Sequence, residues 1–403
     1  MLPRKSWIPP RGEVPLVGLS ILNEEENAVR DAVRALVARE IAPKSQEYDL
    51  GEIYPRPNLE ILGKQGYLGM IVDPAFGGVG TSYLAQTLVV EAIAEVDPAT
   101  AVIYEVHNSL HIEAIWRYGT EDQKRRWLPD LCAGQRIGAF ALSEAEAGSN
   151  AAALRTRAVK EDGGYRLTGR KMFITSGGEA DLYLVFATVD PSVKSRGITA
   201  FVVENGAPGL SFGPPMDKMG IRASRTSEVV LDDVFVPDDQ RLGGEGEGYN
   251  MALFLLDGGR VGIAAQGVGI MSAALARSLQ YARERHQFGK PIGTFEGVQW
   301  RLANMATDLH AARLMTYEAA RHREEGPAQR PLFAMAKLFA SEHAVRHAED
   351  AIQIFGGYGY MTEFGVERLL RDAKITEIYE GTSESMRWVI ASHLLKDYDL
   401  DNI

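Results

Sequence analysis

Three things are scarce in this sequence of 403 residues: cysteine, positive charge and long apolar runs. Cys132 is the single cysteine, so no intramolecular disulfide can form, and a reducing, cytoplasmic compartment is expected. The 43 Lys and Arg are outnumbered by 54 Asp and Glu, and a net charge of −11 is the wrong sign for general nucleic-acid binding. No run approaches the roughly 18 apolar residues of a membrane-spanning helix. A soluble protein is therefore expected.

Signatures of the common nucleotide and metal sites are missing as well. No Gly-x-Gly-x-x-Gly follows an expected strand, and neither Gly-x-x-x-x-Gly-Lys nor Gly-x-Ser-x-Gly occurs, so any nucleotide cofactor must be held without those loops. None of the eight histidines has Glu three residues before it, which argues against a di-iron bundle. His107 with His111, and His343 with His347, have i, i+4 spacing but no nearby third ligand. We expect hydrogen-bonded or solvated surface histidines and no metal.

The sequence pattern changes along the chain from helical to β and back to helical. This order predicts an α+β protein of several domains. Residues 1–22 lack the apolar stretch of a secretory signal and are expected to form an N-terminal arm. Residues 23–136 are predicted to be an all-helical domain, because Asn23 and Glu26 have capping-box spacing and apolar residues then recur at helical intervals. Further helices are expected over 58–67, 81–96 and 99–118.

The remaining chain divides into a β region and a helical region. Residues 137–248 carry short β-branched and aromatic segments between glycine turns, which predicts a compact antiparallel β domain or barrel. In residues 249–403, apolar residues from Phe295 onward step by 3 and 4, the spacing of a helical bundle. Four helices of similar length are predicted, three of them over 250–285, 329–355 and 364–395.

Seven motifs now give the sequence a family resemblance. FALSEAEAGSN at 140–150 and IYEGTSE at 378–384 resemble the two signatures of the acyl-CoA dehydrogenase family. Between them, in the family's order, stand KMFITSGG (171–178), KMGIRASRTSEVVLDDVFV (218–236), RHQFG (285–289), QIFGGYG (353–359) and RDAK (371–374). The resemblance covers nearly the whole chain after Asn23. It implies an N-terminal helical domain, a middle β domain and a C-terminal four-helix bundle, which is the order already predicted from the sequence patterns.

The resemblance also implies FAD as the cofactor. The flavin would lie beside the β domain, with its pyrimidine edge and pyrophosphate met by a first stretch: Phe140, Leu142, Ser143, Gly148 and Ser149. Glycine permits close backbone approach there. Phe173 would pack on the flavin face, and Thr175 would lie near its N5 atom.

A second set of cofactor contacts is expected to come partly from a neighbouring subunit. It comprises Arg285, Gln287, Phe288, Gln353, Gly357, Thr382 and Glu384. An arginine guanidinium forks well onto phosphate oxygens. The resemblance therefore implies a homo-oligomer, most often a homotetramer built as a dimer of dimers.

Glu380 occupies the family's position for the base that removes the substrate's α proton. A carboxylate suits that role when desolvation raises its pKa, and the neighbouring Tyr379 ring could exclude water. Some relatives carry the base instead just before an arginine of the bundle's first helix, but that position here is Gly259. The Glu380 backbone N–H would bind the thioester oxygen, an oxyanion-hole role worth roughly 10² to 10³ in rate.

The expected substrate contacts are Ser149, Asp257, Arg260, Tyr379 and Gly381. Asp257 and Arg260 resemble residues that meet the pantetheine and nucleotide parts of CoA. Two positions depart from the family pattern: Asn150 stands where Asp is usual, and Arg225 where a small or acidic residue is common.

The expectation is an acyl-CoA dehydrogenase of fatty acid β-oxidation that forms trans-2-enoyl-CoA and passes electrons to electron-transfer flavoprotein. The stretch 102–110 resembles the short-chain, butyryl-type branch, so a shallow pocket for acyl groups of roughly C4 to C6 is expected. Two alternatives stay open: an oxidase that uses O₂, and a non-catalytic protein that binds acyl-CoA or acyl carrier protein.

Overall fold

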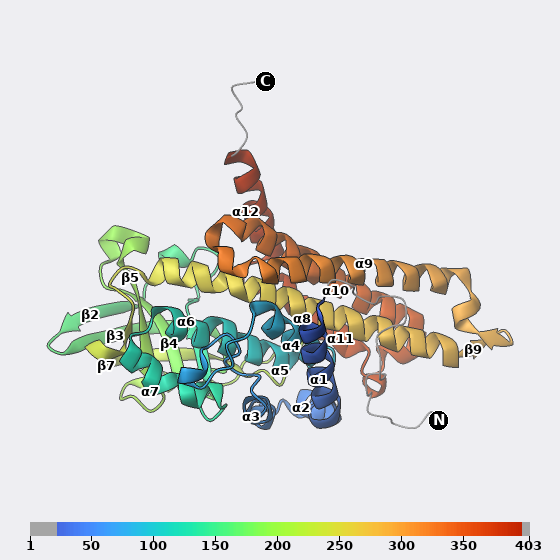
Figure 1. The fold of residues 1–403 in the computed structure, drawn as a ribbon, viewed down its shortest axis with the longest axis horizontal. Helices are drawn as coiled ribbons and strands as arrows, with labels where there is room; N and C mark the ends of the chain where they lie inside the picture. The colour runs from blue at the N-terminus through green and yellow to red at the C-terminus, as the bar shows by residue number, and fades with distance from the viewer. Residues whose placement is uncertain (1–21, 397–403) are drawn as a thin grey trace, which may run out of the picture.

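The computed structural model describes residues 22–396 and has the predicted α, β, α order (Figure 1). A sheet lies at one end of a bundle of long helices, and the N-terminal helices pack along the side of that bundle. The expected fold class is confirmed. Apart from residue 22, the expected N-terminal arm lies outside the described residues.

The first helix begins where its capping signal predicts. In α1 (Glu24–Glu40), the Asn23 side chain accepts the Glu26 N–H and the Glu26 carboxylate accepts the Asn23 N–H, both at 2.8 Å. Val33 and Val37 lie on its buried face. The other helices of this part are α2 (Ala42–Gly51), α3 (Arg56–Lys64), α4 (Tyr83–Ala94), α5 (Pro98–Glu105), α6 (Glu113–Tyr118) and α7 (Glu121–Cys132).

A π-helical segment interrupts the single helix expected over residues 99–118. This segment, η2 (Val106–Ile112), separates α5 from α6. Buried Asn108 donates to the Tyr104 carbonyl at 2.9 Å and accepts the Gly69 N–H at 2.7 Å. Such long-range hydrogen bonds are not encoded in apolar periodicity, so the sequence predicted a continuous helix. π segments are frequent at functional sites.

Three of the four paired histidines, His107, His111 and His347, are buried, and the expectation of surface histidines is wrong for them, while His343 is half-buried. The Gly138 N–H donates to His107 Nδ1 at 3.0 Å, and His111 Nδ1 lies 3.0 Å from the Ala139 carbonyl. Burial lowers the pKa of His107 to about 4 and that of His111 to about 3, so both rings are neutral at pH 7. They join the π segment to the sheet.

The β domain is a mixed sheet, not the antiparallel one predicted. Its strands are β1 (Gly138–Ala141), β2 (Arg157–Glu161), β3 (Gly164–Thr175), β4 (Leu182–Thr188), β5 (Ile198–Glu204), β6 (Leu210–Phe212), β7 (Thr226–Pro237) and β8 (Arg241–Leu242). The order is β6-β7-β3-β2-β4-β5-β8, and β1 pairs with β4. Both β1 and β2 run parallel to β4. The intervening chain supplies the long crossover that parallel pairing needs, which local alternation cannot reveal.

The C-terminal domain has three long helices and a fourth that is broken. α8 (Gly248–Glu284), α9 (Glu296–Arg321) and α10 (Arg330–Phe355) agree with the predicted bundle, and the two short strands β9 (His286–Gln287) and β10 (Lys290–Pro291) follow α8. The helix expected over 364–395 is instead α11 (Glu367–Lys374) and α12 (Ser383–Lys396). The break contains Glu380 and Gly381, whose φ angles of 53° and 101° end any α-helix. The prediction of four helices of similar length was therefore wrong.

α8 is the core helix of the molecule. By length and hydropathy it could span a membrane, contrary to the expectation that no run comes close, but 83% of its apolar window is buried inside the fold. α4, α5, η2, α9, α10 and α11 all pack against it. The apolar residues of α8 are therefore explained by its packing inside the fold.

One arginine joins the three domains. Arg368 of α11 donates to the Ser45 carbonyl at 2.9 Å, to Asp97 at 2.8 Å and to Asp372 at 2.9 Å. Asp372 in turn accepts the Ile221 N–H of the β domain at 2.5 Å. All these side chains are buried, so their charges must be compensated by one another. The cluster holds α11, and with it the break before α12, in place.

Replacing Arg368 by Met should therefore lower the free energy of unfolding by about 3–5 kcal/mol, because Asp97 and Asp372 would be left buried without a cation. Thermal and denaturant unfolding would measure this. Arg387→Met is the matched control: it breaks only the exposed pair with Glu342 and should cost under about 1 kcal/mol. Equal losses in both variants would contradict the role of the cluster.

Candidate active site

The side chain of Glu380 rests directly on α8. A Cβ added at Gly259 would lie 1.8 Å from Glu380 Oε2, so any side chain at 259 would displace this carboxylate. Oε2 is shielded from solvent although the residue as a whole is partly exposed. Glu380 also adopts a left-handed φ of 53°, which costs energy in a non-glycine residue. The fold thus holds one carboxylate in a specific, strained position.

Charged groups of three elements set the protonation of Glu380. Burial raises its pKa, while the neighbouring Glu105 carboxyl of α5 and the positive charges of Lys337 and Arg260 lower it. Lys337 of α10 donates from Nζ to the Gly381 carbonyl at 2.7 Å, and burial lowers its pKa to about 8. The balance leaves a carboxylate that is more basic than one in water.

The expected substrate residues Asp257, Arg260 and Tyr379 lie around this carboxylate. Arg260 Nη1 donates to Asp257 at 2.7 Å, and Arg330 Nε donates to the other Asp257 oxygen at 2.8 Å. The Tyr379 hydroxyl donates to Gln266 of α8. These contacts fix the side chains of Asp257 and Tyr379.

The residues expected to meet the flavin lie where β1 ends, beside the last residues of β3. The Met172 N–H donates to the Ser143 carbonyl at 2.9 Å, which brings the first signature next to β3. Phe173 lies at a bulge of β3 with a φ of 61° and leaves 67% of its surface exposed. Thr175 follows it, and beyond β1 the Gly148 backbone has nothing within 4 Å of an added Cβ. The first stretch thus lies beside an uncovered aromatic ring, that of Phe173. Its remaining members are Phe140 in β1, buried Leu142 after it, and exposed Ser149.

The second expected set lies elsewhere in the chain. Arg285, at the end of α8, lies 5.4 Å from the ring centre of Tyr358, which follows Gly357. Phe288 is 93% exposed. Figure 1 shows β9, which holds Gln287, at the opposite end of the molecule from the sheet. The chain therefore does not bring its own β9 segment next to the sheet. Gln353 is exposed near the end of α10, while Thr382 and Glu384 lie at the start of α12, with Thr382 Oγ1 accepting the Ser385 N–H.

The two departures from the family pattern are surface features. Asn150 is exposed, and Arg225 Nη1 donates to Glu179 at 2.7 Å. An added Cβ at Gly178 would lie 3.3 Å from the same arginine. Arg225 therefore pairs locally at the edge of the sheet.

Sequence reasoning missed Glu105, Lys337 and Gln266. Each is a buried polar residue in an otherwise apolar helix, as in Val102-Ile103-Tyr104-Glu105-Val106, and that isolation was the available signal. Their convergence on Glu380 joins segments far apart in the chain and is visible only in three dimensions.

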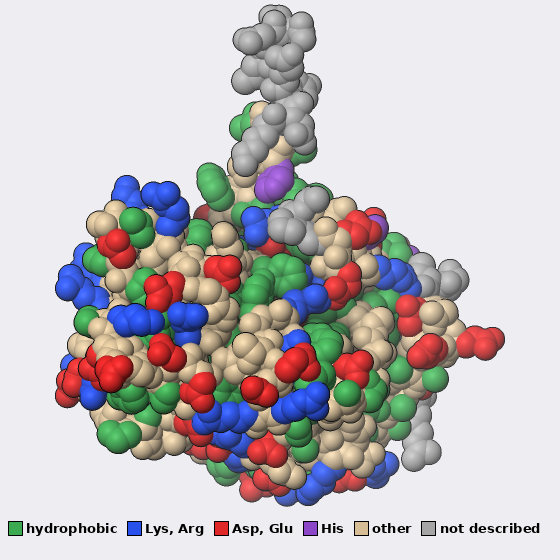
Figure 2. Space-filling view, turned by 60° about the vertical axis from the view of Figure 1, so that its left-hand side comes forward, with side chains coloured by type: hydrophobic (Ala, Val, Ile, Leu, Met, Phe, Trp, Pro, Cys, Tyr) green, Lys and Arg blue, Asp and Glu red, His purple; other side chains and the backbone are tan. Residues whose placement is uncertain are grey.

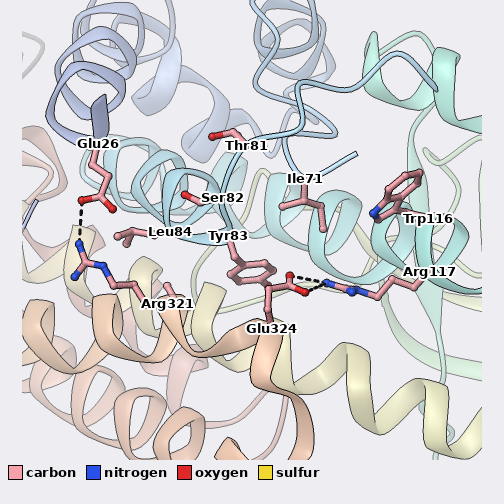
Figure 3. A pocket seen from close by; sticks show the side chains of 11 residues that line it. Glu26, Ile71, Thr81, Ser82, Tyr83, Leu84, Trp116, Arg117, Arg321 and Glu324 are labelled. Carbon is pink, nitrogen blue, oxygen red and sulfur yellow. Dashed lines mark hydrogen bonds and ion pairs between the residues drawn. The ribbon is translucent and has the colours of Figure 1, made fainter. Parts of the chain in front are cut away.

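A separate pocket of about 410 Å³ lies where α4, α6 and α9 meet (Figure 3). Two ion pairs, Arg117 with Glu324 and Arg321 with Glu26, lie at its rim. It shares no residue with the Glu380 site. Tyr83 connects the two regions, because its hydroxyl would lie 2.6 Å from a Cβ added at Gly258.

Comparison with known proteins gives the same domain order. Family models described as acyl-CoA dehydrogenase N-terminal, middle and C-terminal domains match residues 23–135, 139–234 and 246–395. A short-chain specific acyl-CoA dehydrogenase from Megasphaera elsdenii is 44% identical over 362 residues, 89% of this chain and 94% of the relative.

Two solved structures are also similar over most of their length. Butyryl-CoA dehydrogenase from Megasphaera elsdenii has a TM-score of 0.90 at 42% identity, covering 93% of this chain and 99% of that one. A chain from work on the electron transferring flavoprotein of Acidaminococcus fermentans has a TM-score of 0.92 at 42% identity, covering 94% and 100%.

The contact of Glu380 with Gly259 can be tested by substitution. Gly259→Ala should destabilise the protein by about 1–3 kcal/mol, because the methyl group overpacks the site, and should turn the carboxylate away from α8. Thermal unfolding and a crystal structure would measure both effects. Gly297→Ala, on the open face of α9, is the control and should be neutral or slightly stabilising. An unmoved Glu380 in the Gly259 variant would refute the packing argument.

Proposed function

Because the chain belongs to the acyl-CoA dehydrogenase family, we propose that it is an FAD-dependent enzyme that converts a short saturated acyl-CoA into trans-2-enoyl-CoA. The motif resemblance is confirmed for the family and for its short-chain, butyryl-type relatives. The observation that carries the proposal is the buried Glu380 carboxylate, held on α8 at Gly259 and surrounded by the residues expected to meet substrate.

The chain's own surfaces fit FAD. Phe173 presents an uncovered ring beside the open backbone at Gly148, and exposed flat aromatic surface of this kind suits stacking by a ring system. We propose that Phe140, Leu142, Ser143, Ser149 and Thr175 join them in binding the flavin end. When bound, FAD supplies the two-electron acceptor for the hydride that leaves the β carbon.

Glu380 is the proposed catalytic base. Burial makes its carboxylate a stronger base than an exposed one, while the positive charges of Lys337 and Arg260 act against this shift and favour the ionised form. It takes the α proton of the acyl group, so that the α C–H bond breaks as the Glu380 O–H bond forms. The Glu380 N–H, at the turn before Gly381, would donate to the thioester oxygen and acidify that proton.

The proposed CoA contacts are Asp257, Arg260, Ser149, Tyr379 and Gly381. Asp257 is buried and held by two arginines, so it offers a fixed acceptor for amide groups of the pantetheine. The Tyr379 ring is fastened through its hydroxyl to Gln266 and would exclude water from the reacting carbons.

A short acyl group fits the packing next to the base. Glu105 packs on α8 at Gly262, three residues (about 4.5 Å along the helix axis) from Gly259. A long acyl tail that follows α8 would have to displace this side chain. Val102, Ile103 and Leu110 are fully packed nearby, and packed interiors accept few extra methylenes.

We also propose a homo-oligomer, a dimer of dimers, that passes electrons to electron-transfer flavoprotein. Figure 1 draws β9, which holds Gln287, at the opposite end of the molecule from the sheet, so we assign the second FAD set, which includes Arg285, Gln287, Phe288, Gln353 and Gly357, to the flavin of a neighbouring subunit. Thr382 and Glu384 are assigned to the same set by motif. Large apolar side chains are exposed on the helices, including Trp300, Trp388 and Leu395, which suits subunit contacts. The face drawn in Figure 2 has acidic and basic side chains interspersed.

Glu380→Gln should keep FAD and acyl-CoA binding but slow anaerobic flavin reduction by about 10² to 10⁴, the usual effect of a positioned base. Stopped-flow bleaching of the flavin with butanoyl-CoA measures this. Glu342→Gln, an exposed acid on α10, is the control and should reduce at the wild-type rate. Near-normal reduction by the Glu380 variant would place the base elsewhere.

Titration with acyl-CoAs of increasing length should give the highest kcat/KM at roughly C4 to C6. Each methylene in the pocket is worth about 1–3 kcal/mol of discrimination, so the decline beyond the optimum should be steep. The measurement is steady-state turnover of a panel from butanoyl-CoA to dodecanoyl-CoA. Faster turnover of dodecanoyl-CoA than of butanoyl-CoA would overturn the short-chain assignment alone.

A further inference from the structure

A second carboxyl group lies beside the proposed base. Glu105 is the last residue of α5, directly before the π segment, and is fully buried. With both side chains ionised, Glu105 Oε1 and Oε2 and Glu380 Oε2 are buried without a hydrogen-bond partner among residues 22–396. Buried oxygens of this kind are costly when unpaired. A proton on one of the two carboxyls would remove the deficit, since it makes that group a donor to the other.

Two glycines of α8 bring the carboxyls together. A Cβ at Gly262 would lie 2.4 Å from Glu105 Cγ and 2.8 Å from its Oε1, and one at Gly259 would lie 1.8 Å from Glu380 Oε2. Residues three apart share one face of a helix. Both carboxyls therefore lie in one groove on the same face of α8, within reach of a side-chain hydrogen bond to each other.

We propose that Glu105 is a positioning residue that holds one proton and donates it in a hydrogen bond to the Glu380 carboxylate. The assignment rests on the proposed function, in which Glu380 is the base. Glu105 touches no reacting atom in this account. It fixes the orientation of the Glu380 carboxylate and keeps that group ionised despite its burial.

The charges around the pair decide which carboxyl keeps the proton. Two cations face Glu380: Lys337 from α10 and Arg260 from α8. An anion, Glu113 of α6, faces Glu105. This asymmetry makes ionisation easier for Glu380 and harder for Glu105.

The remaining titratable neighbours of Glu105 are three tyrosines: Tyr83 on α4, Tyr104 on α5 and Tyr379 before Glu380. All three are neutral, because burial raises their pKa values well above the usual range. The Ser109 hydroxyl works in the opposite direction and lowers the pKa of Glu105. Burial and the Glu380 charge outweigh it and raise the pKa of Glu105 well above normal.

The arrangement also accommodates the product of proton abstraction. Before the reaction the pair carries one proton and one negative charge. When Glu380 takes the α proton, the pair holds two protons and no charge, so neither carboxyl repels the other. Lys337 and Arg260 then remain as the cations of the site.

The first test compares Glu105→Gln, which keeps a donor but cannot ionise, with Glu105→Leu, which removes the donor. An enzyme whose base must be ionised gains activity as the pH rises through the pKa of that base. Loss of the hydrogen bond raises the pKa of Glu380, so the acid limb of kcat/KM should move up by about one to two pH units in the Leu variant. The limb should stay near wild type in the Gln variant. Profiles are kept below pH 7.5, because the pKa of Lys337 is about 8.

The second test needs no turnover. Infrared difference spectra at pH 7, wild type minus Glu105→Gln, should show the C=O band of a protonated carboxyl that belongs to Glu105. Glu342→Gln, which alters an exposed acid, should leave that band in place. This readout decides the proton's location even if no acyl-CoA reduces the flavin, an outcome that would defeat the proposed function alone.

Three results would overturn the inference. The first is absence of the protonated band, the second is an unmoved acid limb in a folded Glu105→Leu variant, and the third is an equal shift in the Gln and Leu variants. If the Leu variant does not fold, the Gln variant and the infrared band decide.

Discussion

The close approach of other elements to α8 is the constraint on which the rest of the structure depends. Gly269 lets α4 pack with the Glu91 carbonyl 2.5 Å from where a Cβ would be, and Gly267 meets Ala340 of α10 at 3.0 Å. Gly262 and Gly259 receive Glu105 and Glu380. The same buried helix thus forms the core of the bundle, the wall of the N-terminal domain and the platform of the active site. Glycine is a poor helix former, costing roughly 1 kcal/mol relative to Ala, and tertiary packing outweighs that loss here.

Two groups of buried charges differ in how completely their polar atoms are paired. Around Arg368, every guanidinium nitrogen has a carboxylate or carbonyl partner, and Arg313 is similarly held by Glu91, which also accepts from the Tyr317 hydroxyl at 2.6 Å. Such complete pairing makes a rigid joint. Glu105 and Glu380 instead share fewer partners than their oxygens could accept. Incomplete pairing of buried carboxyls leaves basicity available for chemistry, and proteins tolerate such local deficits chiefly at functional sites.

Local rules in the sequence predicted the parts of the fold that are local. The Asn23 capping box and the bundle periodicity after Phe295 needed only neighbouring residues, and both the capping box and the long helices are present. The π segment, the parallel β1–β4 pair and the break at Glu380 were missed. Each depends on a partner distant in sequence: Gly69 for Asn108, β4 for β1, and α8 for the 375–382 turn.

The sequence predicted the residues of the site only where they stand in recognisable motifs. Glu380, Asp257 and Arg260 were found because they stand in recognisable motifs, and the structure brings these three together. Glu105 was passed over because nothing near it in sequence indicates that it faces a carboxyl 275 positions away. Its apolar neighbours identified only a buried helix, and burial alone does not distinguish a catalytic neighbour from an ordinary core residue.

In the proposed function, the binding of FAD and the assembly of the subunits are thermodynamically coupled. Figure 1 shows β3, which carries Phe173, and β9, which follows Arg285, at opposite ends of the chain, so on this proposal a complete FAD site takes residues from two chains. A ligand that binds only the assembled form stabilises it by mass action. FAD would then strengthen the contacts between subunits as well as supply the acceptor. The exposed ring of Phe288, unfavourable in an isolated chain, would become a contact in the proposed assembly. The long α8 serves this arrangement directly, because it carries Gly259 near one end and leads to Arg285 at the other.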